Sequence, residues 1–133
     1  YNLGGEIVHK LTQSINKKIE GSVLIYAQKI KLNDNQFIVA EFKNKQIKSK
    51  ALFAVETKNL NFKKPTISYQ IENNTITLQT DIPAFEVYLH GIEGRFSDNF
   101  FSLLPGEKKI LKFEGEKLSK NKLLIWSLYD LNK

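Results

Sequence analysis

Residues 94–107, GRFSDNFFSLLPGE, carry more structural information than any other part of this sequence. Ser97-Asp98-Asn99 predicts a turn, because short polar side chains hydrogen-bond their own backbone and tolerate unusual φ angles. Pro105-Gly106 predicts a type II turn, whose central positions need the fixed φ of proline and the positive φ of glycine. The apolar side chains expected to dock these turns on a core are Phe100, Phe101, Leu103 and Leu104.

Outward from these residues, short segments of alternating hydrophobicity predict β-strands. The clearest are Thr66–Glu72, Thr75–Thr80, Phe85–His90, Lys109–Phe113 and Leu123–Tyr129. Asn73-Asn74 predicts a tight hairpin between the first two, since asparagine tolerates the left-handed φ that such a turn requires. The last segment is apolar on both faces, which predicts a central strand with Trp126 in the core. Several short strands joined by turns favour an all-β antiparallel sandwich.

The first fifty residues are also β-like, with strands predicted at Glu6–Leu11, Gly21–Ile30 and Gln36–Phe42. Ala51–Val55 is predicted to be a further strand or a linker strand. A half-sandwich built from these segments would leave one hydrophobic face bare, so something else must cover it. Two arrangements are open: the strands belong to a preceding sandwich, or they dock on the terminal sandwich and enlarge it.

The composition limits the classes of function. The chain has 133 residues and a formal net charge of +6, and Arg95 is the only arginine among its 20 cations. Because phosphate and base recognition favour guanidinium groups, the lysine excess is predicted to solvate strand surfaces rather than to bind nucleic acid. No apolar run is long enough for a membrane span. The absence of cysteine excludes thiolate metal sites, His9 and His90 lack a third ligand, and no metal or cofactor is predicted.

In the identity and order of their residues, positions 97–107 resemble the Ser-Asp-Asn-aromatic-Phe … Leu-Leu-Pro-Gly-Glu signature near the C-terminus of β-mannosidases of glycoside hydrolase family 2. The resemblance is strongest over residues 51–131 and includes the final run Leu-Ile-Trp-Ser-Leu-Tyr-Asp-Leu. It implies a C-terminal immunoglobulin-like antiparallel β-sandwich at residues 51–133. Residues 1–50 resemble the latter half of the immunoglobulin-like domain that precedes this sandwich in those enzymes.

The resemblance also implies that the chain is a non-catalytic module of a larger glycosidase. Enzymes of that family hydrolyse terminal, non-reducing β-D-mannose residues with retention, in a barrel whose acid/base glutamate directly follows an asparagine. This sequence contains no Asn-Glu dipeptide, so the chain alone is expected to have no catalytic residues. Its expected partner is the remainder of the parent glycosidase, including the catalytic barrel. Because such enzymes are often exported, a periplasmic or secreted parent is implied.

Two hypotheses for a functional site follow from these residues, and a third hypothesis concerns the excess of lysine. The first is a docking turn on the barrel, made of Ser97, Asp98, Asn99, Phe100, Phe101, Leu104, Pro105 and Gly106. The second is an autonomous module that binds mannose-containing carbohydrate, with sugar rings on aromatic side chains and hydroxyls on polar partners. Its expected contacts are Tyr69, Tyr88, Tyr129, Asp98 and Asn99. The third, a lysine-rich adhesion or nucleic-acid-binding sandwich, predicts salt-dependent binding to polyanions.

Overall fold

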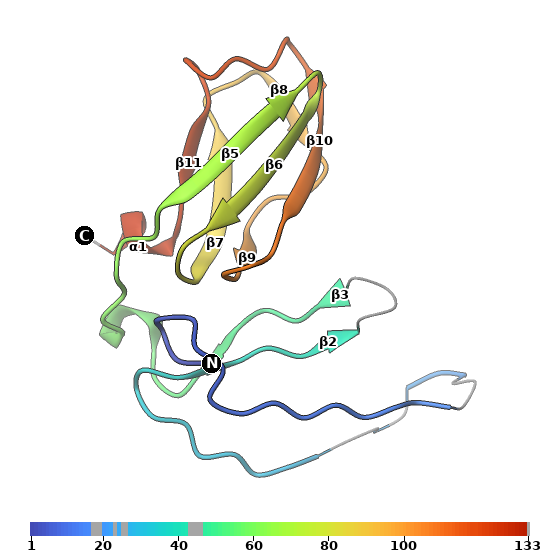
Figure 1. Cartoon of the computed structure of the whole chain (residues 1–133), viewed down its shortest axis with the longest axis vertical. Helices are drawn as coiled ribbons and strands as arrows, with labels where there is room; N and C mark the ends of the chain where they lie inside the picture. Colours follow the sequence, from blue (N-terminus) through green and yellow to red (C-terminus); the bar gives the residue numbers. More distant parts are fainter. Residues whose placement is uncertain (17–19, 23, 25–26, 43–46, 133) are drawn as a thin grey trace.

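Two antiparallel β-sheets pack face to face in the computed structural model of the chain, which describes residues 1–16, 20–22, 24, 27–42 and 47–132 (Figure 1). One sheet has the strand order β5-β6-β10-β8 and the other the order β11-β7-β9. Every strand pair in both sheets is antiparallel. The predicted all-β antiparallel sandwich is therefore confirmed.

The four-stranded sheet contains the predicted hairpin. Its strands are β5 (Ile67–Glu72), β6 (Thr75–Thr80), β10 (Lys109–Gly115) and β8 (Gly94–Phe96). The hairpin pairs every residue of β5 with one of β6. Asn73 in its turn has a φ of 52°, the left-handed conformation that asparagine tolerates. Among the described strands, β5 and β8 form the two edges of this sheet.

The three-stranded sheet consists of β7 (Ala84–His90), β9 (Phe101–Leu103) and β11 (Leu124–Trp126). A β-bulge lies in β7 between Ala84 and Val87, where Glu86 has a φ of 47°. Because a bulge inserts one extra residue, it changes which side chains face inward. Phe85 therefore leaves the space between the sheets, whereas Val87 and Leu89 enter it.

The core between the sheets is formed by alternating side chains from both of them. Its buried members are Ile76, Leu78, Ala84, Val87, Leu89, Phe96, Leu103, Leu111, Phe113, Leu118 and Leu123. These positions include the inward residues that the alternation in Thr75–Thr80 and Phe85–His90 predicts, apart from Phe85. Burial of this apolar surface is the main favourable contribution to folding of the sandwich.

The prediction of a central strand at Leu123–Tyr129 is wrong. The strand β11 ends at Trp126, and Ser127 caps the short helix α1 (Leu128–Leu131) in a capping box with Asp130. Since β11 is an edge strand, it is not buried on both faces. Trp126 pairs with Tyr88 and lies on the outer face with 44% of its surface exposed, so its predicted place in the core is also wrong.

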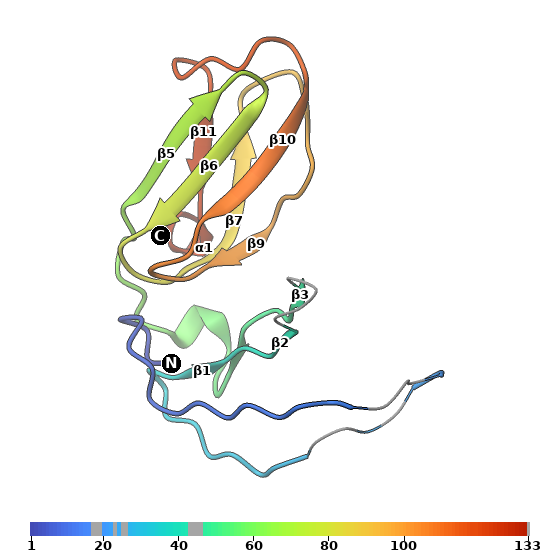
Figure 2. The same ribbon diagram turned by 45° about the vertical axis from the view of Figure 1, so that its right-hand side comes forward.

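The N-terminal part forms an interrupted hairpin beside one end of the sandwich (Figure 2). Its strands are β1 (Phe37–Ile38), β2 (Glu41–Phe42), β3 (Ile47–Lys48) and β4 (Leu52–Phe53). β1 pairs with β4 and β2 with β3, and a 3-10 helix, η2 (Thr57–Asn59), leads toward the sandwich. The strands predicted at Gln36–Phe42 and Ala51–Val55 are thus present in shortened form.

The two strands predicted nearer the N-terminus are not found. Glu6–Leu11 forms no strand, and neither do the described residues of Gly21–Ile30, whose other positions lie outside the described part. These segments project from the body of the molecule (Figure 1). Their exposed apolar side chains include Ile7, Val8, Leu11, Leu24 and Ile30. The predictions failed because a strand needs a neighbouring strand to pair with, and none of the described strands pairs with these segments.

A cluster of phenylalanines joins the N-terminal hairpin to the sandwich. Phe85 from β7 meets Phe37 and Phe53 edge to face, with ring centroids 4.9 and 5.0 Å apart. Phe62 and the buried Leu104 complete the contact. The hairpin therefore packs on the sandwich. The division into domains at residues 1–50 and 51–133 stays a prediction.

Candidate functional site

Residues 97–100 connect the two sheets. The Ser97 N–H donates to the Lys112 carbonyl in β10 (2.8 Å), and the Lys112 N–H donates to Ser97 Oγ (3.0 Å). The Asn99 side chain then pairs with both backbone groups of Leu89 in β7: its Oδ1 accepts from the N–H (2.8 Å) and its Nδ2 donates to the carbonyl (3.0 Å). The Asn99 amide thus takes the place of a strand residue beside β7.

Asp98 is held by the same crossover. Its carboxylate accepts from Lys109 Nζ at 2.5 Å and from the Asn99 N–H at 2.9 Å. Lys109 Nζ also lies 4.8 Å from the ring centroid of Phe101, within cation–π range. Asp98 and Asn99, which were expected as hydrogen-bond partners for a sugar, therefore both serve the connection between the sheets.

The Pro105-Gly106 corner has the predicted type II geometry. The Glu107 N–H donates to the Leu104 carbonyl at 3.1 Å, and Gly106 has a φ of 81°. Leu104 is buried in the phenylalanine cluster, and Pro105 lies against Gly5, while the Glu107 carboxylate pairs with Lys48. This corner contacts the N-terminal part of the same chain. Docking of the turn on a catalytic barrel remains a prediction.

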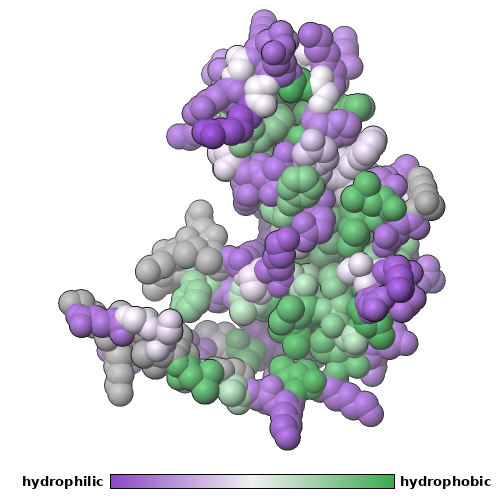
Figure 3. Space-filling model, turned by 180° about the vertical axis from the view of Figure 1, so that it is seen from behind, coloured by the Kyte–Doolittle hydropathy of each residue, from purple (hydrophilic) through white to green (hydrophobic). Residues whose placement is uncertain are grey.

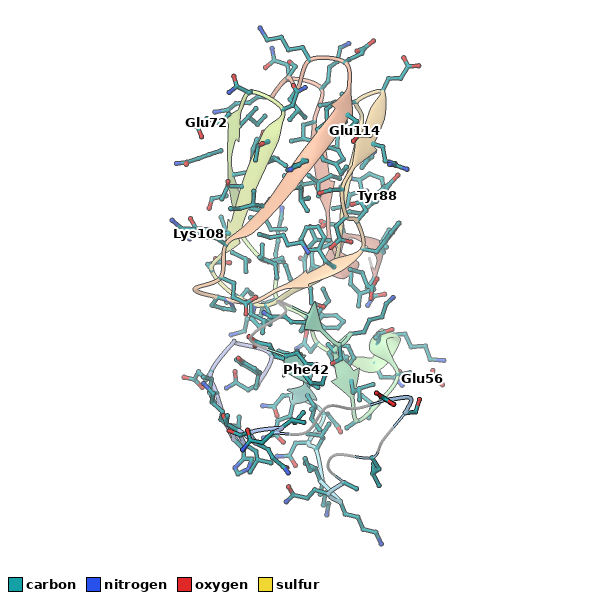
Figure 4. All side chains as sticks on the ribbon, turned by 90° about the vertical axis from the view of Figure 1, so that its right-hand side faces the viewer. Phe42, Glu56, Glu72, Tyr88, Lys108 and Glu114 are labelled. Atoms are coloured by element: carbon teal, nitrogen blue, oxygen red, sulfur yellow. The ribbon has the colours of Figure 1, made fainter. Side chains whose placement is uncertain are left out.

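Four rings form a row across the outer face of the three-stranded sheet, which we call the aromatic row: Phe100, Tyr88, His90 and Trp126. The centroids of Phe100 and Tyr88 are 4.7 Å apart with nearly parallel planes, and those of Tyr88 and His90 are 5.1 Å apart. His90 meets Trp126 edge to face at 4.5 Å. Figure 4 shows Tyr88 on the opposite side of the sandwich from Glu72 in β5.

The two ends of the aromatic row are the most exposed. Phe100 is 53% exposed and has a φ of 58°, an uncommon conformation for a bulky residue. Its neighbour Phe101 packs against the core, as expected for adjacent side chains of which only one can be buried. His90 Nε2 inside the row is buried and has no hydrogen-bond partner among the described residues. The exposed apolar surface of the row is therefore concentrated at its ends, Phe100 and Trp126.

The residues expected to contact sugar do not converge. Tyr69 packs against the core from β5 in the four-stranded sheet, and Tyr129 lies in α1. Only Tyr88 belongs to the aromatic row. The sequence analysis missed His90 and Trp126 as part of this surface, although Tyr88 and His90 alternate with the inward Val87 and Leu89. Carbohydrate binding stays a prediction.

Comparison with models of protein families shows which family this chain belongs to. The model of the mannosidase Ig-fold domain matches residues 55–131, which span β5 to α1 and cover more than half of the chain. The chain belongs to the family of mannosidase Ig-fold domains. No curated protein matches it. The matched range contains the whole sandwich and begins after the N-terminal hairpin.

A cavity of about 580 Å³ lies where the Ig-fold domain meets the N-terminal hairpin. Phe100, Asp98 and Lys109 line it from the sandwich, and Val39 and Lys50 line it from the other side. Lys50 is also ion-paired with Glu86 in the β7 bulge at 3.3 Å. Seen from behind, hydrophobic side chains gather around this junction (Figure 3). The aromatic row thus reaches the junction through Phe100.

Asp81 has the one carboxyl in the described part whose pKa is clearly shifted. Its Oδ1 accepts from the Thr66 N–H at 2.7 Å and from the Ile82 N–H at 2.8 Å. The hydrogen bonds from Thr66 lower the pKa of Asp81 below its ordinary value. Because this carboxylate joins the start of β5 to the β6–β7 connection of the Ig-fold domain, its role is structural.

Among the described residues, no cluster of histidine and carboxylate side chains could hold a metal ion. No helix in the described part combines the length and hydrophobicity needed to cross a bilayer. The clearest surface feature of the Ig-fold domain is the aromatic row.

Proposed function

We propose that this chain is a C-terminal, non-catalytic immunoglobulin-like module of a family 2 β-mannosidase-like glycoside hydrolase, in which it supports the catalytic barrel. The parent enzyme would hydrolyse terminal, non-reducing β-D-mannose residues with retention. The observation that carries this proposal is the match of residues 55–131 to the mannosidase Ig-fold domain. A β-sandwich is not a catalytic barrel, so the chemistry belongs to another part of the polypeptide.

The contacts that residues 97–107 make within the chain support an accessory role. Ser97 and Asn99 hydrogen-bond the two sheets together, and Asp98 pairs with Lys109. Leu104 and Pro105 pack toward the N-terminal part. Because these side chains are engaged in folding, the likeness in sequence reflects the needs of a sandwich and its docking rather than those of catalysis.

The exposed apolar side chains near the N-terminus support a related proposal. We assign residues 1–50 to the latter half of a preceding immunoglobulin-like domain. Ile7, Val8 and Leu11 are exposed on a segment that has no strand partner among the described residues. Further strands of such a domain would pair with this segment and cover its apolar side chains.

The test compares the full-length polypeptide that carries this chain with the 133-residue chain alone. The full-length protein should hydrolyse an aryl β-D-mannoside, with the β-anomer as the first product detected by NMR. The isolated chain should show no hydrolysis. Activity of the isolated chain, or a full-length protein that is inactive on β-mannosides, would contradict the proposal.

Support of the catalytic barrel by this module can be tested separately, through the thermal inactivation of the full-length enzyme. Leu111 is fully buried in the sandwich core, and Leu111→Ala should destabilise the module by about 2–5 kcal/mol. If the module supports the barrel, this change lowers the temperature at which the full-length enzyme loses activity. An unchanged inactivation temperature, with the module itself destabilised, would show that the barrel does not depend on it.

A further inference from the structure

We infer that the aromatic row is a docking surface for another domain of the same polypeptide. This deepens the proposed function, on which it rests, by assigning the contact to Phe100, Tyr88, His90 and Trp126 rather than to the Pro105-Gly106 corner. The partner surface should offer aliphatic side chains together with carbonyl or carboxylate oxygens. These features follow from the geometry and surroundings of the row.

The two outer faces of the sandwich differ in character. The outer face of the four-stranded sheet is mostly polar, with Ser68, Gln70 and Glu72 on β5 and Thr75, Thr77 and Gln79 on β6. The outer face of the other sheet carries the aromatic row, and Leu124 beside it is also exposed. An extended apolar area on one face only is typical of an interaction surface.

The stacking of the rings argues for a protein partner and against an oligosaccharide. Sugars pack their C–H faces on the open faces of aromatic rings. In the aromatic row, Tyr88 is stacked between Phe100 and His90, so its two faces are already covered. The most exposed parts of the row are its end rings, Phe100 and Trp126. Their apolar surface suits aliphatic side chains, and aromatic ring edges carry partial positive charge that attracts oxygen atoms.

Backbone geometry indicates that the exposed end of the row is held in place. Phe100 adopts a positive φ of 58°, and its N–H donates to the Val87 carbonyl at 2.8 Å. Such a conformation is unfavourable for a residue with a side chain, and strain of this kind tends to occur where a side chain has a function. Its effect here is to place an aromatic ring in solvent against Tyr88.

The position of the row identifies the partner as a domain of the same polypeptide. Phe100 lines the cavity at the junction, where Val39 and Lys50 of the N-terminal part already face the sandwich. The row is therefore continuous with an interface that this polypeptide makes with itself. Lys50, 77% exposed beside the row, pairs with Glu86 of β7 and is one of the contacts of this interface.

The test is hydroxyl-radical footprinting with mass spectrometry on the isolated chain and on the full-length polypeptide. Trp126, the only tryptophan of the chain, and Phe100 should be oxidised readily in the isolated chain. In the full-length protein their oxidation should be roughly tenfold slower, because the centre of a protein interface excludes water. Ile110 is 62% exposed on the opposite face and should be oxidised equally in both. Equal oxidation of Trp126 in both proteins would overturn the inference.

Variants separate docking from folding. Trp126→Thr should change the thermal midpoint of the isolated chain little but lower that of the full-length protein, whereas the matched control Ile110→Thr should act alike in both. If Trp126→Thr lowers both midpoints equally, the role of Trp126 is confined to the sandwich and the inference fails.

Experiments on the isolated chain would show whether a different partner binds the aromatic row. Protection of Trp126 by mannotriose would assign the row to carbohydrate, and a dimer that Trp126→Thr dissociates would assign it to a second copy; either result overturns the inference. An active β-mannosidase with an unprotected row would remove the docking surface and leave the proposed function intact. A row that is protected in a full-length protein without glycosidase activity would support the docking surface and contradict the proposed function.

Discussion

Asn99 shows how a single side chain can replace a piece of secondary structure. Its amide supplies both the acceptor and the donor that Leu89 needs at a point where β9 has not yet begun. A glutamine would be too long and an aspartate could not donate. Asparagine at this position is therefore explained by the geometry of the β7 edge.

Asn99→Ala should destabilise the chain. The change leaves the N–H and carbonyl of Leu89 without partners, and we expect a loss of about 1–3 kcal/mol in the free energy of unfolding. Urea denaturation followed by tryptophan fluorescence would measure it. Asn121→Ala, at an exposed loop position, is the matched control and should change stability by less than about 0.5 kcal/mol. Equal effects of the two changes would contradict this role of Asn99.

Asp81 gives stability a dependence on pH. Because its pKa is lower in the folded state, its contribution is fully present above the unfolded pKa of about 3.9 and is lost as the pH falls through the folded value. Asp81→Asn should therefore be less stable than the parent chain at neutral pH, and the difference should disappear in acid. Urea midpoints measured across this range check the expectation. A difference that stays constant into strong acid would refute it.

At the scale of elements, the sequence predicts the strands that have a local partner. The hairpin of β5 and β6 is found where alternation and Asn73-Asn74 place it, because a hairpin is defined by neighbouring residues. The type II turn at Pro105-Gly106 was predictable for the same reason. Alternation also predicted which side chains of β7 face inward, except at Phe85, where the bulge intervenes.

The errors concern elements whose surroundings are set at long range. Leu123–Tyr129 is apolar on both faces, but Leu124 and Trp126 are exposed on the outer face, and Trp126 belongs to the aromatic row. The Ser127-x-x-Asp130 capping box was the available signal that the strand ends there. The row could not be predicted as a unit, because Phe100, Tyr88 and Trp126 meet only through strand pairing and the crossover.

Gly106→Ala tests the turn alone. No atom lies within 4 Å of the position that a Cβ would occupy, so the substitution causes no clash. Its cost is that of a positive φ for a residue with a side chain, about 1 kcal/mol, and it should lower the thermal midpoint by several degrees. Gly106→Asn should cost less, because asparagine tolerates this conformation. Equal midpoints for the two variants, measured by calorimetry, would contradict this explanation.

At the scale of the whole molecule, Phe85 links the sandwich to the N-terminal hairpin. Phe85→Ala removes a buried ring that contacts Phe37, Phe53 and Phe62, and such changes cost about 3–5 kcal/mol. We expect the N-terminal hairpin to detach while the sandwich stays folded. Limited proteolysis should then cleave before residue 60 much faster than in the parent chain.

The matched control for this experiment is Phe42→Ala. Phe42 lies in β2 of the same hairpin (Figure 4), is about half exposed and is not among the residues of the phenylalanine cluster. Its replacement should leave the rate of cleavage nearly unchanged. If both variants are cleaved alike, the hairpin is not held by Phe85, and the two parts are joined by other contacts.

The open edge of β5 has a consequence for the handling of the purified protein. β5 pairs only with β6 among the described strands, and Glu72 is the only charged residue along its six positions. Such an edge invites intermolecular strand addition, the first step toward fibrillar aggregates. Pro65, with two lysines before it, opposes this at one end of the strand. Concentrated samples should therefore aggregate through β5, and Gln70→Lys would place a positive charge along this edge and oppose the addition of a second chain.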